Sequence, residues 1–66
     1  MAIKNNLQLQ WNCLMIERTV SELVLHGMTS NKDLVDYVSS VYPPMDEFEM
    51  EHYSEAIIYA KLGVLN

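Results

Sequence analysis

Two consecutive prolines, Pro43 and Pro44, constrain the fold of this chain more than any other feature. Proline lacks a backbone N–H and restricts the residue before it, so a helix that reaches this point must end. Asp46 follows as a natural N-cap for a new helix, and Glu49 stands where a capping box needs it. The sequence therefore predicts a helical chain interrupted here, with a fresh helix starting at Asp46.

This last helix is expected to end at Gly63, a residue suited to the position just beyond a helix terminus. Met45 and Met50 lie where a hydrophobic staple would join the helix to the preceding residue. Apolar residues recur at intervals of three and four, which predicts one buried face made of Met50, Tyr53, Ile57, Ala60 and Val64. A β-strand over residues 56–60 is the alternative, but no partner strand is found elsewhere.

The first helix is predicted from Asn6 to His26, with Asn5 or Asn6 as its cap and Gly27 just beyond its end. One apolar stripe follows its full length and is expected to form the core of the domain. Its residues are Leu9, Cys13, Ile16, Val20, Leu23 and Val24.

A second apolar stripe, made of Leu7, Trp11, Leu14 and Met15, projects from roughly the opposite side of the same helix. Arg18 and Glu22 then take over that side. A helix that is apolar on two sides is normally covered on both, which favours a contact outside the three-helix unit. The alternative is a bend at residues 15–18 that rotates the buried face.

Between these helices the sequence predicts a turn over residues 28–32 and a short helix capped by Ser30 or Thr29. Its buried positions are expected to be Leu34, Val38 and Val41, flanked by Tyr37 and Tyr42. The predicted fold class is all-α, an antiparallel three-helix bundle, with residues 1–66 forming one domain.

The last helix also carries apolar residues away from its core face. A chain of 66 residues cannot bury a large core, and its single cysteine cannot form an internal disulfide. Self-association is the remaining route to stability. We therefore expect a homodimer whose interface contains Leu7, Trp11, Leu14, Ile58 and Leu62.

The formal net charge is −5, and the basic residues Lys4, Arg18, Lys32 and Lys61 are scattered along the chain. Such a field repels a phosphate backbone, so direct nucleic-acid binding is not expected. Acidic residues gather instead on the last helix. They predict either a solvated helix face or a docking surface for a basic partner formed by Glu47, Glu51 and Glu55.

No residue set indicates catalysis. Glu49 and His52 have the spacing of half a di-iron motif, but a second motif is missing, so we expect no metal and no cofactor. Cys13 lies on the core stripe without an activating neighbour. For these reasons we expect that the protein is not an enzyme. The amino end lacks the features of a secretion signal and no stretch is long enough to cross a bilayer, so we expect a cytoplasmic protein.

Several short segments resemble one family of small enterobacterial regulators. The segments are residues 20–27 (VSELVLHG), residues 31–34 (NKDL) and residues 51–53 (EHY) with Ile57. Together they make the chain, from about Leu14 to Leu62, similar to the YmgB/AriR and YcgZ proteins. This resemblance implies a compact all-α dimer with the shape of Hha-type nucleoid regulators. It also implies a role in biofilm formation and acid tolerance, as a connector to two-component phosphorelays.

The leading hypothesis is therefore a small acidic dimeric regulator that acts by protein–protein contact on a transcription factor or a response-regulator pathway. One alternative is a direct DNA-binding or nucleoid-associated protein. Another is an acidic inhibitor that blocks a basic site on a host protein.

Overall fold

The computed structural model describes residues 6–66 and contains three helices. They are α1 (Asn6–Leu25), α2 (Asn31–Val41) and α3 (Glu47–Leu65), and no strand occurs among residues 6–66. The prediction of an all-helical fold with three packed helices is confirmed. The predicted cap at Asn5 lies outside the described residues.

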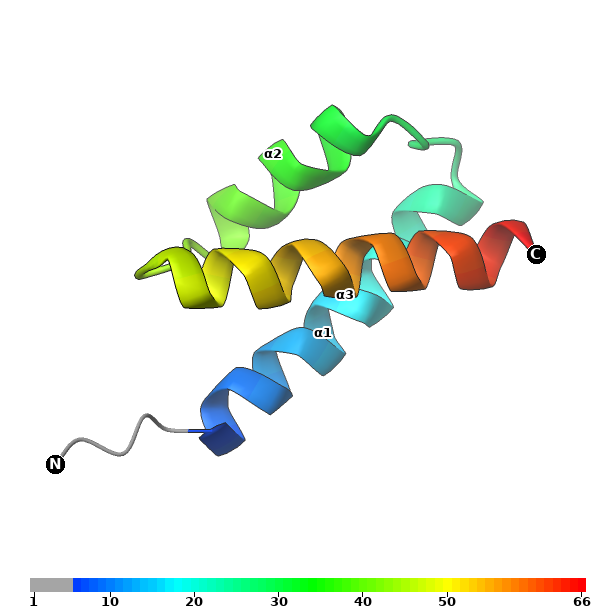
Figure 1. The fold of residues 1–66 in the computed structure, drawn as a ribbon. Coiled ribbons are helices and arrows are strands. Elements are labelled where there is room, and N and C mark those ends of the chain that lie inside the picture. Colours follow the sequence, from blue (N-terminus) through cyan, green and yellow to red (C-terminus); the bar gives the residue numbers. More distant parts are fainter. Residues whose placement is uncertain (1–5) are drawn as a thin grey trace, which may run out of the picture.

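α1 and α3 are packed against each other and run in the same direction (Figure 1). The Asn12 side-chain amide donates to the Tyr53 hydroxyl at 2.9 Å, and the Cys13 thiol lies 3.9 Å from the His52 carbonyl oxygen. Both contacts join the first half of α1 to the first half of α3. In Figure 1 the two helices cross obliquely, and α2 returns beside α3 in the other direction. At its first residue, Asn31, α2 accepts a hydrogen bond from Lys61 near the end of α3.

The core is the contact zone of one face from each helix. α1 buries the same face from Leu9 to Val24, so it does not rotate its buried side, and the alternative of a bend at residues 15–18 is wrong. Cys13 and Leu23 lie partly buried against this core, as the predicted stripe requires. The core residues are Leu9, Ile16, Val20, Val24, Leu34, Val38, Tyr53, Ala56, Ile57 and Ala60.

Side-chain caps fix the start of the second and third helices. Ser30 Oγ accepts from the Asp33 N–H at 3.4 Å, and Asp46 Oδ1 accepts from the Glu49 N–H at 2.9 Å. Glu49 reaches back and accepts from the Met45 N–H at 2.9 Å, one residue before the position that a capping box uses. The predicted starts at Ser30 and Asp46 are confirmed.

The predicted end of α3 at Gly63 is wrong, because the helix continues to Leu65. Among the described residues a positive φ occurs only at Gly27, so Gly63 does not adopt the left-handed conformation of a terminating glycine. Val64 packs against the core, and this burial extends the helix past a residue that disfavours it.

Two predicted buried positions are exposed. Met50 is 45 % exposed, because the buried side of α3 begins only at Tyr53 and continues through Ala56, Ile57 and Ala60. Val41 is half exposed because α2 ends there, and Tyr42 packs on the core instead. Met45 is 83 % exposed, so the predicted staple to Met50 shields neither methionine.

Candidate interaction surface

A groove runs along the seam between α1 and α3, and the residues that line it belong to these two helices, except for Asn66 just after α3. Its first section lies between Leu14 on α1 and Phe48 on α3. Its last section lies between Ser21 on α1 and Leu62 on α3. Glu17 and Glu55 border the middle section, so the groove is apolar at its ends and acidic at its centre.

All five residues predicted for the dimer interface have exposed side chains. Leu14 and Leu62 line the groove, whereas Leu7, Trp11 and Ile58 lie outside its lining, further round each helix. Their exposed fractions are 77 % for Leu7, 61 % for Trp11, 58 % for Leu14, 51 % for Ile58 and 53 % for Leu62. The fold thus leaves these side chains available for a further contact, and the contact itself stays a prediction.

Two large apolar residues on the same helix surfaces were missed from the sequence. Leu25 and Leu65 are 68 % and 57 % exposed, and each is the last residue of its helix. The signal for Leu65 was its spacing of three from Leu62, which continues the exposed stripe of α3.

The predicted acidic surface is present as one stripe of α3. Glu47, Glu51 and Glu55 are exposed and follow each other at intervals of four residues. Glu47 and Glu51 border a shallow hollow beside Phe48, while Glu55 faces the groove. The side chains of these three residues form no hydrogen bond or ion pair with the described part of the chain. This side of α3 is therefore acidic from Glu47 to Glu55 and apolar from Ile58 to Leu62.

Arg18 differs from the other basic residues of the described chain. Lys32 is paired with Asp36, and Lys61 donates to Asn31. Arg18 is exposed and forms no hydrogen bond or ion pair within residues 6–66. Lys4 lies outside the described residues. Arg18 thus offers a free positive charge directly after the apolar stripe of α1.

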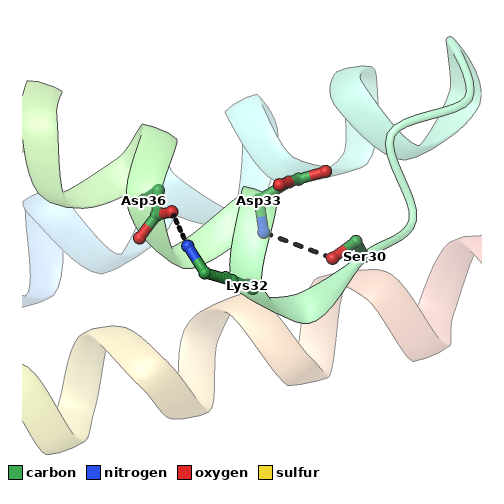
Figure 2. Close-up of polar contacts among 4 residues, drawn as sticks. All are labelled: Ser30, Lys32, Asp33 and Asp36. Carbon is green, nitrogen blue, oxygen red and sulfur yellow. Dashed lines mark hydrogen bonds and ion pairs between the residues drawn. The ribbon is translucent and has the colours of Figure 1, made fainter.

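The outward side of α2, which a helix-turn-helix would present to DNA, is largely neutralised (Figure 2). Lys32 Nζ lies 2.8 Å from Asp36 Oδ2, and this hydrogen bond raises the pKa of Lys32. Asp33 lies exposed beside them with its N–H bonded to Ser30. A side with one paired cation and two carboxylates is poorly suited to contacts with phosphates.

Cys13 lines the groove in a setting that favours its protonated thiol. Partial burial raises the pKa of Cys13 above its ordinary value, and the charges of Glu17 and Glu55 raise it further. A thiol with a raised pKa is a poor nucleophile at neutral pH.

The side chain of His52, which also lines the groove, is held close to its own helix. Its Nδ1 lies 2.9 Å from the Phe48 carbonyl oxygen, and its ring lies 4.4 Å from that of Phe48, between centroids. The described residues contain no group of three side chains able to hold a metal ion.

None of the helices within residues 6–66 has the length and apolar character needed to span a bilayer. Comparison of the chain with protein-family models, curated proteins and solved structures gave no match.

Proposed function

We propose that this chain is a homodimeric regulatory protein that acts by binding another protein. The observation that carries the proposal is the surplus apolar surface on both long helices, from Leu7 to Leu14 on α1 and from Ile58 to Leu65 on α3. Contiguous exposed apolar residues of this kind mark interaction surfaces in small soluble proteins. A second copy would cover this surface.

Size supports the same proposal. A 66-residue chain buries little apolar area, and its described core contains ten buried hydrophobic residues. Burial of Trp11 and the leucines against a second copy would enlarge that core. In the proposed assembly each subunit is an antiparallel three-helix bundle, as the sequence predicts.

The acidic stripe of Glu47, Glu51 and Glu55 is the proposed docking surface for a basic partner. These carboxylates are exposed and unpaired within the described chain, so a partner need not break existing ion pairs to reach them. Complementary charge steers such encounters and speeds association. The resemblance to the YmgB/AriR and YcgZ regulators suggests a cytoplasmic transcription factor or response regulator as this partner.

Affinity capture from a cell extract tests the docking surface. The bait is the full chain, compared with a Glu47→Lys/Glu51→Lys variant and with a matched Asp33→Lys/Asp36→Lys variant that changes the charge equally on α2. We expect the first variant to lose the captured partner and the second to retain it. Equal capture by all three baits would show that the acidic stripe is not the docking surface.

Direct DNA binding is the competing function from a different class, and a salt-titrated shift assay separates it from protein binding. A protein that contacts several phosphates loses affinity steeply as salt rises. We expect no tight duplex binding at low salt, because the outward side of α2 carries Asp33 and Asp36. Tight, strongly salt-dependent binding would favour a nucleoid-associated protein instead.

A further inference from the structure

The groove between α1 and α3 has three sections that follow each other at intervals of one helical turn. Leu9 and Cys13 line the first section, and Cys13 and Glu17 line the middle one. Glu17 and Ser21 line the last section. Helix residues four positions apart are about 6 Å apart along the axis. A further helix that lay along the groove could therefore place one side chain in each section from positions four residues apart.

The three sections differ in their chemistry. Apolar side chains line both ends, with Leu14 and Phe48 in the first section and Leu62 in the last. The middle section is bordered by one carboxylate from each helix, Glu17 from α1 and Glu55 from α3. Neither carboxylate forms a hydrogen bond or an ion pair within residues 6–66. A helix that matches the groove is therefore apolar at two positions and positively charged at the position between them.

The two carboxylates of the middle section act on the same place. Both charges raise the pKa of Cys13, whose side chain lines this section. An apolar side chain placed here would remove water from two unpaired charges, which is costly. A lysine or arginine would instead supply the missing opposite charge, so the middle position of a bound helix is restricted to a basic residue.

A second copy of this chain does not match these requirements. Two copies that met groove to groove about a two-fold axis through the middle section would bring identical acidic sections together. Among the described residues, Arg18 is followed one turn later by the acidic Glu22 where an apolar residue is needed. Lys32 and Lys61 already bond to side chains of their own chain. The occupant that fits the groove therefore belongs to another protein.

We propose that the α1–α3 groove binds an amphipathic helix of another protein, with a lysine or arginine between Glu17 and Glu55 and an apolar side chain one turn away on each side. The inference rests on the proposed function and specifies the chemistry of the basic partner. Leu7, Trp11 and Ile58 lie outside the groove lining, so an occupied groove leaves them available to a second copy.

Selection from a library of displayed helical peptides tests the inference. The peptides have about 15 residues, enough to follow α1 from Leu9 to Ser21, and vary at three positions spaced by four residues. The bait is the unmodified full chain. We expect enrichment of lysine or arginine at the middle position and of large apolar residues at the outer two. A middle position without basic enrichment would overturn the inference.

Two matched baits locate the charge that the peptide recognises. Glu17→Gln/Glu55→Gln removes the carboxylates of the middle section, and Asp33→Asn/Asp36→Asn removes two carboxylates from α2. We expect only the first variant to lose the basic preference, with the dissociation constant of the selected peptide rising about tenfold or more. Basic enrichment that persisted in the first variant, or disappeared equally in both, would contradict recognition in the groove.

A change in the peptide gives a second measurement that leaves the protein untouched. Replacing the middle basic residue of the selected peptide by glutamine should weaken its binding to the unmodified chain by a similar factor. The same replacement should have little effect on binding to the Glu17→Gln/Glu55→Gln variant, because the charge partners are already absent. Circular dichroism checks that this variant is folded. Independent, additive losses would show that the peptide cation does not meet these two carboxylates.

Sedimentation of the chain with the selected peptide separates this inference from the proposed dimer. The expected species is a dimer that carries the peptide. A dimer that selects no such peptide would overturn the inference and leave the proposed dimer standing. A monomer that binds the peptide would do the reverse. A peptide that binds only by splitting the dimer would show that a second copy covers the groove, and the inference would fail.

Discussion

At Cys13, burial and two neighbouring carboxylates all raise the pKa of the thiol. The protonated form is therefore favoured in the folded chain. Burial is the largest cause, and the charges of Glu17 and Glu55 follow. The residue thus acts as a packing group with restrained reactivity.

Removing one of the two charges should make this thiol ionise more easily. In Glu17→Gln the pKa of Cys13 should fall, so the pH at which alkylation reaches half its maximal rate should shift to lower values. The thiolate is the reacting form, so the rate rises with pH in both proteins. Alkylation by iodoacetamide over a pH series gives the two midpoints. Glu22→Gln, which removes a charge outside the groove lining, should leave the midpoint unchanged. An unshifted midpoint in Glu17→Gln would contradict this account.

The sequence placed Cys13 on the core stripe, and the structure confirms that it packs against the core. Its proximity to Glu55 could not be predicted, since that depends on how α1 and α3 are aligned along their lengths. The prediction that Met50 is buried was wrong for a related reason. Apolar spacing alone did not reveal that Ala56 would be buried beside Tyr53, Ile57 and Ala60 while Met50 stays exposed.

At the scale of single helices, the caps could be predicted because capping depends on residues only three positions apart. We expect Asp46→Ala to lower the free energy of unfolding by about 1 kcal/mol. Ser30→Ala should cost less, because its hydrogen bond is 3.4 Å long compared with 2.9 Å for Asp46. Urea denaturation at one protein concentration measures both changes. A larger loss for Ser30→Ala would show that the capping distances do not govern these helix starts.

The two glycines should respond oppositely to alanine. Gly63 lies within α3 with open space where a Cβ would be added, so Gly63→Ala should stabilise the chain by about 0.5–1 kcal/mol. Gly27 has a φ of +103°, which a side chain disfavours, so Gly27→Ala should destabilise it. Thermal unfolding followed by circular dichroism compares the two. A stabilising Gly27→Ala would refute the assigned backbone conformation. The sequence suggested Gly63 as a helix end because it could not show that Val64 is packed against the core.

For the whole molecule, the exposed apolar residues on α1 and α3 were largely predictable, since they fall outside the core stripe of each helix. What covers these residues could not be predicted in the same way, because it depends on how a second molecule packs against them. Trp11→Glu should dissociate the proposed dimer, because it places a charge among the exposed apolar residues of α1. Val41→Glu on α2, at a position that is also half exposed, should leave it intact. Analytical ultracentrifugation distinguishes the outcomes, and equal behaviour of the two variants would argue against the α1–α3 face.

The central claim is that a second copy covers the apolar surface that three packed helices leave exposed. Sedimentation equilibrium of the unmodified chain at micromolar concentration tests it most directly. The expected result is a mass twice that of the 7.6 kDa chain. A folded, stable protein that sediments as a single chain over the same concentrations would contradict the claim.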